Sequence, residues 1–172
     1  MTKDEKLNNC TWSTNYIGEF IVFSDFFKRD VKIVIITDDN LERSLTDAMV
    51  LSVNDFVNLN DESKPLMSDL LYKHCLECCE EASYGFEVRE GENETQANLR
   101  EFGVSDKNDA FNKANLESIS ITDDEIAKRT NRYVKIGFYP EWEEEHGCVL
   151  VLKNGILLDY CGGHDTYLND FE

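Results

Sequence analysis

The sequence predicts an α+β domain with a mainly antiparallel sheet, two main helices packed on one face and a C-terminal β-hairpin. Three observations support this prediction: β-branched runs near the start, two amphipathic helical segments in the middle, and an Asn-Gly turn between apolar runs near the end. The length of 172 residues suits one domain. We expect a flexible tail over residues 1–15 and a single domain over residues 16–172, with a mobile acidic insert near residues 87–101.

The ordered part of the chain is expected to begin with two strands. Residues 20–23 and 31–37 are rich in β-branched and aromatic side chains, which favour an extended backbone. The segment between them, residues 24–30, has about the length of a hairpin connection. The two strands are therefore expected to pair antiparallel.

Two helices are expected next. Thr46 can accept hydrogen bonds from the first turn of a helix, and the apolar positions that follow it recur at helical spacing. Those positions are Met49, Val50, Val53, Phe56 and Val57. The second helix is expected to start at Pro65, because the amide hydrogen that proline lacks would be unpaired in a first turn, and to run to about Ala82.

After the second helix, the periodic pattern of apolar residues weakens before two further strands are expected. Residues 87–101 are rich in Glu and contain no run of apolar side chains, which indicates an exposed excursion. Ser105 is expected to cap a short helix that ends at Asn112. Residues 116–121 alternate as a half-buried strand does, and residues 132–138 are expected to form another strand.

The terminal hairpin is the clearest local feature. Asn154 and Gly155 separate the apolar runs 148–153 and 156–161, and this dipeptide favours a two-residue turn of the primed type. Counting outward from the turn places Lys153 opposite Ile156. The same count places Cys148 opposite Cys161, in a pair whose side chains would be at their closest.

The charge balance narrows the class of partner. The formal net charge is −18, so anions far outnumber the cations that a nucleic-acid backbone would require. No apolar stretch approaches the roughly 20 residues that span a bilayer, and the polar first residues do not resemble a signal peptide. We therefore expect a cytoplasmic protein that binds neither nucleic acid nor membrane, with its six cysteines as thiols.

Two groups of Cys and His residues have the chemistry of metal ligands or redox pairs. In the predicted second helix, His74 is followed by Cys75, Cys78 and Cys79, and the Cys-x-x-Cys spacing suits zinc or a redox pair. Residues three apart on a helix also share one buried face, and we favour this packing interpretation. The hairpin offers a second alternative zinc set, which consists of His146, Cys148, Cys161 and His164. We expect no metal and no cofactor.

The sequence carries no strong signature of catalysis. It contains neither a Gly-x-Ser-x-Gly elbow nor a Gly-rich phosphate loop nor a zinc-protease helix. Glu145 and His146 remain an alternative acid and base pair. We therefore expect a binding protein rather than an enzyme.

The segment near the carboxyl end resembles a known group of proteins. Trp142, Glu145, His146 and Gly147 form a Trp-x-x-Glu-His-Gly motif that leads into the hairpin and its Asn154-Gly155 turn. This motif is similar to one in uncharacterised bacterial cytosolic domains, whose members are candidate toxin-immunity proteins. The chain departs from that pattern at Cys148, where an aliphatic residue or Met is more usual. The resemblance implies structural roles for the motif, including Asn154 and Gly155, and it transfers no catalytic residue.

If the motif is structural, function has to lie on the acidic surface around it. From residue 140 to residue 172 the chain has eight acidic residues and a single Lys. Such a surface speeds encounter with a cationic protein. The expected partner is a cationic protein such as a cognate toxin, for example a nuclease domain, and the alternative function is zinc binding or thiol redox chemistry. The expected partner-binding residues are Glu141, Glu143, Glu144, Asp165 and Asp170.

Overall fold

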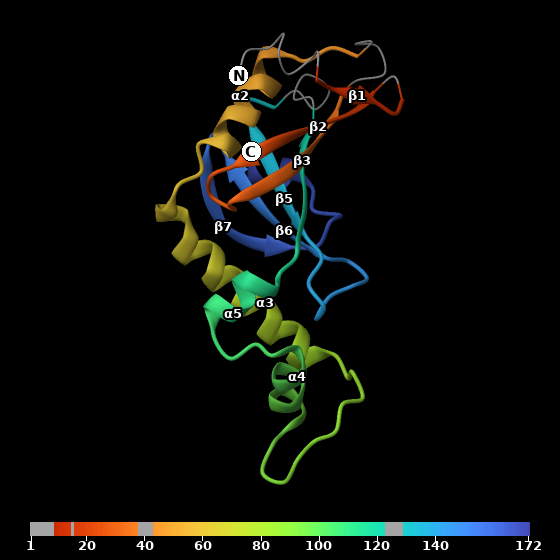
Figure 1. Ribbon diagram of the computed structural model, residues 1–172, viewed down its shortest axis with the longest axis vertical. Coiled ribbons are helices and arrows are strands. Elements are labelled where there is room, and N and C mark those ends of the chain that lie inside the picture. The colour runs from red at the N-terminus through yellow and green to blue at the C-terminus, as the bar shows by residue number, and fades with distance from the viewer. Residues whose placement is uncertain (1–8, 15, 38–42, 123–128) are drawn as a thin grey trace.

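The computed structural model describes residues 9–14, 16–37, 43–122 and 129–172 and contains a seven-stranded sheet in the order β1 to β7 (Figure 1). All neighbouring strands are antiparallel except β3 and β4, which pair in parallel. The strands are β1 (Thr11–Trp12), β2 (Ile17–Ser24), β3 (Arg29–Ile36), β4 (Leu116–Thr122), β5 (Tyr133–Phe138), β6 (Cys148–Lys153) and β7 (Ile156–Gly162). The predicted α+β fold class is confirmed.

The helices lie in the long crossover between β3 and β4, because parallel neighbours cannot be joined by a tight turn. They are α2 (Asp47–Val57), α3 (Lys64–Glu81), α4 (Glu94–Phe102) and α5 (Lys107–Lys113), with a 3₁₀ turn η1 (Asp61–Ser63) before α3. The start of α2 follows the prediction, since the Thr46 side chain accepts a hydrogen bond from the amide of Met49. Pro65 lies in the first turn of α3, also as expected.

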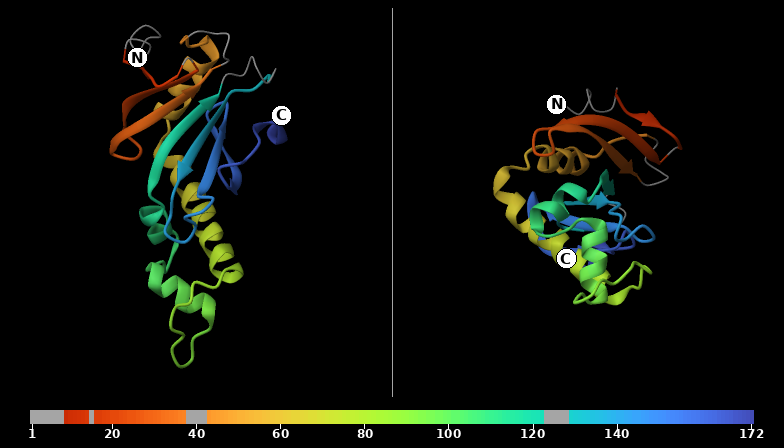
Figure 2. Two further views of the ribbon diagram at one scale, coloured as in Figure 1. Left: turned by 90° about the vertical axis from the view of Figure 1, so that its right-hand side faces the viewer. Right: turned by 60° about the horizontal axis from the view of Figure 1, so that its bottom comes forward.

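Helices α2 and α3 cover one face of the sheet. The main core lies between them and the inward side chains of the strands, such as Ile33, Ile119 and Leu150, all of which are fully buried. Figure 2 shows that α3 extends past the end of the sheet, where α4 and α5 pack against it. Beyond the sheet, α3 is therefore held by these two smaller helices.

The opposite face is covered only in part. The chain after β7 ends in the 3₁₀ turn η2 (Leu168–Phe171), and Leu168 packs with Tyr133, Val149 and Val151 on this side of β5 and β6. The Tyr133 hydroxyl donates to the carbonyl of Phe171 at 2.8 Å and fixes this covering segment. Within the described residues, no helix combines the length and the apolar character that a membrane crossing requires.

Two segments differ from the sequence-based expectation. Thr11 and Trp12, which we assigned to the N-terminal tail, form β1 and pair with β2; residues 1–8 and 15 of that tail lie outside the described part. Much of the expected acidic insert is helix α4, whose start is fixed by a reciprocal capping box between Asn93 and Gln96. The acidic composition of this segment led us to expect an exposed excursion rather than a helix. The spacing of Asn93 and Gln96 is nevertheless a helix-start signal.

The start of the next helix is also shifted by one residue. Asp106, rather than Ser105, caps α5, because its carboxylate accepts from the amides of Asn108 and Asp109. Ser105 instead donates its hydroxyl to the Asp109 carboxylate. Both residues are good helix caps, so the sequence alone did not separate them.

The hairpin forms around Asn154 and Gly155 as predicted, with Lys153 opposite Ile156. The predicted pairing of Cys148 with Cys161 is wrong. An irregularity in β7 shifts the register, so that Leu150 lies opposite Cys161. The shift is by two residues, which keeps Cys161 on the same face as Cys148, because side chains alternate with a period of two.

Candidate functional site

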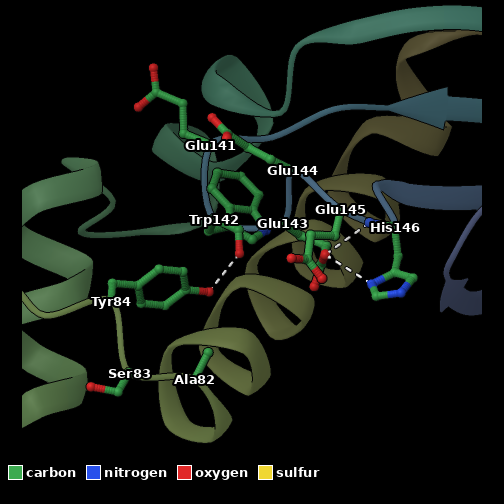
Figure 3. Close-up of a pocket in the computed structure, with 9 residues that line it drawn as sticks. All are labelled: Ala82, Ser83, Tyr84, Glu141, Trp142, Glu143, Glu144, Glu145 and His146. Atoms are coloured by element: carbon green, nitrogen blue, oxygen red, sulfur yellow. Dashed lines mark hydrogen bonds and ion pairs between the residues drawn. The ribbon is translucent and has the colours of Figure 1, made fainter.

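A pocket of about 420 Å³ lies where the end of α3 meets the loop between β5 and β6 (Figure 3). Four of its lining side chains are glutamates and a fifth is a histidine. The lining residues are Ala82, Ser83, Tyr84, Glu141, Trp142, Glu143, Glu144, Glu145 and His146. The structure thus gathers three of the five expected partner-binding residues around one pocket.

Trp142 anchors the loop that forms this pocket. Its side chain is 1% exposed, and its indole nitrogen donates to Nδ1 of His74 on α3 at 3.2 Å. The hydroxyl of Tyr84 donates to the Trp142 carbonyl at 2.6 Å, as the dashed line in Figure 3 shows. The loop is therefore fixed both to α3 and to the segment that follows it, and its glutamates project from a rigid support.

Glu143 has a structural role within the pocket. Its Oε1 accepts from the His146 backbone amide at 3.0 Å, and the His146 ring nitrogen Nδ1 lies 3.3 Å from the same oxygen. Partial burial acts to raise the pKa of Glu143, but these hydrogen bonds outweigh it and hold the pKa below its usual range. Glu143 therefore stays ionised and closes the turn that leads into β6.

The other three carboxylates face solvent. Glu141, Glu144 and Glu145 are exposed, and in the part of the chain that the structure describes no hydrogen bond or ion pair engages them. They lie within five consecutive residues of the anchored loop, so their charges act together. A cationic side chain would be attracted to this position.

A group of Cys and His side chains lies next to the pocket. One ligand atom each of His74, Cys148 and Cys161 lies within 4.8 Å of the others. Sγ of Cys78 lies 3.8 Å from Nε2 of His74, and the same thiol donates to Oε2 of Glu143 at 3.8 Å. Helix α3 thus supplies His74 and Cys78, and the terminal hairpin supplies Cys148 and Cys161.

The ionisation of this group disfavours a thiolate nucleophile. Burial, reinforced by the charge of Glu143, raises the pKa of Cys78 to about 12. A hydrogen bond with Cys161, together with burial, raises the pKa of Cys148. Burial also lowers the pKa of His74, although the charges of Glu143 and Glu77 oppose it. The lowered pKa of His74 and the raised pKa of Cys78 and Cys148 disfavour the ion pair that activates a catalytic cysteine.

The alternative zinc set inferred from sequence is divided by the sheet. His146 contacts Glu143 at the pocket rim, and the ring of His164 stacks on Tyr139 with centroids 4.7 Å apart. His164 lies on the face opposite the helices, over Gly137 and Gly147. The structure therefore brings Cys148 and Cys161 together with His74, and not with His146 or His164.

The remaining predicted residues lie apart from the pocket. Asp165 and Asp170 are exposed on the segment after β7. Gly147 has a φ of 58°, and Asn154 and Gly155 form the turn with φ values of 51° and 82°. The Oδ1 of Asn154 also accepts from the Arg132 amide at 2.9 Å, which ties this turn to β5.

Sequence reasoning missed Tyr84 and the contact of His74 with the hairpin. The one available signal for His74 was its spacing of four residues from Cys78, which places both on one helix face. Nothing local linked that face to Cys148 and Cys161, because the contact depends on how α3 packs on β7.

Comparison with known protein families identifies the family of this chain. A family model described as "Domain of unknown function (DUF6985)" matches residues 4–168, which is nearly the whole chain. No curated protein and no solved structure matches the chain.

Proposed function

We propose a protein-binding function for this chain, which belongs to the DUF6985 family of domains of unknown function. The acidic pocket at the β5–β6 loop receives a cationic segment of a protein partner. The observation that carries the proposal is the set of three exposed carboxylates, Glu141, Glu144 and Glu145, which have no hydrogen bond or ion pair among the described residues, on a loop that Trp142 and Tyr84 hold in place.

The physical basis is electrostatic attraction from a rigid support. The chain's formal charge of −18 draws a cationic partner toward the molecule, and the glutamates at the pocket give the contact its location. Arg suits this pocket well, since its planar fork donates two parallel hydrogen bonds to one carboxylate. Little ordering of the loop is needed on binding, because its backbone is already fixed.

The partner class that fits best is a cationic toxin, such as a nuclease domain, which this protein would neutralise as an immunity protein in the cytoplasm. A nuclease carries Lys and Arg to hold phosphates, and an acidic protein that covers them blocks substrate binding. The resemblance of the Trp142–Gly147 motif to candidate immunity proteins supports the same class. Asp165 and Asp170 extend the acidic surface on the segment after β7.

The test compares two triple variants with equal charge change. In the pocket variant, Glu141, Glu144 and Glu145 become Gln; in the control, the exposed residues Glu62, Glu87 and Glu90 become Gln. Each variant and the wild type serve as bait in the producing cell's extract at low and high salt, and captured proteins are identified by mass spectrometry. The partner gene is then expressed with and without each bait.

The proposal expects a basic partner that the wild type and the control capture at low salt and release at high salt. The pocket variant should lose at least about tenfold in affinity for it, as one lost charged contact of about 1.4 kcal/mol already gives. Co-expression of the wild type should relieve growth inhibition by the partner. Equal capture by both triple variants, or an acidic partner, would overturn the proposal.

A further inference from the structure

We propose that His74, Cys78, Cys148 and Cys161 form a binding site for a single Zn²⁺ ion. The site is separate from the acidic pocket and stands independently of the binding function proposed above. Its four side chains come from two elements, α3 and the β6–β7 hairpin, which are far apart in sequence.

The distances are close to those of a zinc site. Zinc bonds of about 2.3 Å to sulfur and about 2.0 Å to nitrogen place tetrahedral donor atoms roughly 3.6–3.8 Å apart. The donor atoms of His74, Cys148 and Cys161 lie within 4.8 Å of one another, and Cys78 Sγ lies 3.8 Å from Nε2 of His74. To bind one ion, the donor atoms of His74, Cys148 and Cys161 have to draw closer together, and Cys78, which lies beside His74 but outside that group of three, has to turn toward the ion to become the fourth ligand.

The elements that supply the ligands also suit a structural zinc site. His74 and Cys78 are four residues apart on α3, so they project from the same helix face. Cys148 begins β6 and Cys161 lies near the end of β7, on the face of the hairpin that packs toward the core. One pair from a helix and one pair from a hairpin is a common arrangement for a four-ligand zinc site.

The donor set selects the metal. Three thiols and one imidazole are soft ligands that favour zinc over calcium or magnesium, which prefer oxygen. Cys148 is fully buried, and His74, Cys78 and Cys161 are half-buried, so the ion would be shielded from water on the side of Cys148. Glu143 lies behind Cys78 and already accepts two hydrogen bonds from His146, so it is the neighbour of the site rather than its fourth ligand.

Metal binding should be visible at Trp142. Nδ1 of His74 accepts the indole hydrogen, so the hydrogen of the neutral ring is on Nε2. If the ion binds Nδ1, the indole loses its acceptor. If the ion binds Nε2, Nδ1 takes the ring hydrogen and again cannot accept. Through either nitrogen, coordination ends the Trp142–His74 hydrogen bond.

The experiment titrates Co²⁺ and then Zn²⁺ into the purified, reduced, metal-free full-length protein. Co²⁺ bound to thiolates in a tetrahedral site has a distinct visible and near-ultraviolet absorption, and Zn²⁺ should displace it at one equivalent. Trp12→Phe leaves Trp142 as the single tryptophan, so its fluorescence should shift as Zn²⁺ binds. The melting temperature of the wild type should rise with Zn²⁺ and fall again with a chelator.

Variants assign the ligands. Cys78→Ser, Cys148→Ser and Cys161→Ser should each lose the thiolate absorption in part and weaken Zn²⁺ binding at least about tenfold, because each removes a direct ligand. Cys10→Ser is the matched control, since Cys10 is a free thiol outside the group, and Glu143→Gln tests the neighbouring carboxylate. Cys10→Ser should bind as the wild type does, and Glu143→Gln should keep the thiolate absorption, because Glu143 is not a ligand.

Three results would overturn the proposal. One is the absence of a thiolate-bound Co²⁺ spectrum in the folded wild type. Another is an equal loss of binding in Cys10→Ser and Cys148→Ser. The third is Zn²⁺ binding that leaves Trp142 fluorescence unchanged. The wild-type measurements decide the matter even if a Cys variant fails to fold.

Discussion

The indole nitrogen of Trp142 lies 3.2 Å from Nδ1 of His74 and joins the β5–β6 loop to helix α3. This bond assigns the ring hydrogen of neutral His74 to Nε2, which points the remaining donor toward Cys78. The same contact therefore fixes the wall of the acidic pocket and the state of the nearby thiol group. Loss of this hydrogen bond should therefore affect both the acidic pocket and the thiol group.

Trp142→Phe should destabilise the fold by about 1–3 kcal/mol, because phenylalanine leaves a small void and deprives half-buried His74 of its donor. Urea denaturation measures the change as a lower midpoint at unchanged slope. Trp12→Phe is the control, since Trp12 packs in the short strand β1 at the sheet edge. Equal midpoints for the two variants would contradict a special role for the Trp142–His74 contact.

Gly147→Ala should cost at least about 2 kcal/mol, because its φ of 58° lies in the left-handed region and a Cβ there would overlap the ring of His164. The ideal Cβ would also lie 2.7 Å from the carbonyl oxygen of Phe138. Stability to urea is again the measurement.

A double-mutant cycle separates the two causes. In a His164→Ala background the ring overlap is absent, so Gly147→Ala should cost less there than in the wild type. The part that remains reports the backbone strain and the contact with Phe138. If the cost is the same in both backgrounds, His164 does not press on Gly147.

Local chemistry accounts for the features that the sequence predicted well. Thr46 and Pro65 mark helix starts because each acts within one helical turn, and Asn154-Gly155 forms its turn because both residues tolerate positive φ. The pairs nearest the turn follow from that geometry. The pairing of Cys161 with Leu150 does not, because an irregularity in β7 changes the count beyond Leu157.

The features that the sequence did not predict depend on contacts between distant segments. Nothing near β3 or β4 in sequence specifies their parallel pairing. The Trp142–Gly147 motif was correctly placed at the opening of the hairpin, but its partners, His74 on α3 and Tyr84 just after it, come into reach only when the helix packs on the sheet. Residues about 60–70 positions apart leave no joint pattern in a single sequence.

Asn98→Ala should destabilise the end of α3 by about 1–3 kcal/mol. The buried side chain of Asn98, on α4, donates to the carbonyls of Cys79 at 3.0 Å and Ala82 at 3.3 Å. Cys79 lies in the last turn of α3 and Ala82 is the residue that ends the helix, so no further helical amide can satisfy their carbonyls. Hydrogen exchange should speed up at the end of α3 and in α4.

The control for this prediction is Asn108→Ala, an exposed position in α5 whose side chain carries no such role. It should leave exchange at the end of α3 unchanged. Exchange in Asn98→Ala that matches the wild type would show that water replaces the Asn98 amide without cost.

Arg100→Gln should raise the pKa of Glu92. Arg100 holds both Glu92 oxygens through Nε at 3.0 Å and Nη2 at 3.2 Å, and this pairing, with an added bond from the Arg89 amide, keeps the pKa of Glu92 below its usual range. A carboxyl carbon NMR titration should therefore give a Glu92 midpoint below the ordinary value of about 4.3 in the wild type, and a higher midpoint in the variant.

The sign of the stability effect follows from linkage. Because the folded-state pKa of Glu92 is depressed, its contribution to stability is fully present above the unfolded-state pKa and is lost as the pH falls through the folded-state value. Arg100→Gln should thus lower the urea midpoint at pH 7, and the difference from the wild type should shrink as Glu92 becomes protonated in acid.

Glu90→Gln, at an exposed neighbouring position, should change neither the titration curve nor the dependence of stability on pH. A difference between Arg100→Gln and wild type that stays constant down to the lowest pH would mean that Arg100 acts through packing, or through its bond to the Glu87 carbonyl, rather than through the charge of Glu92.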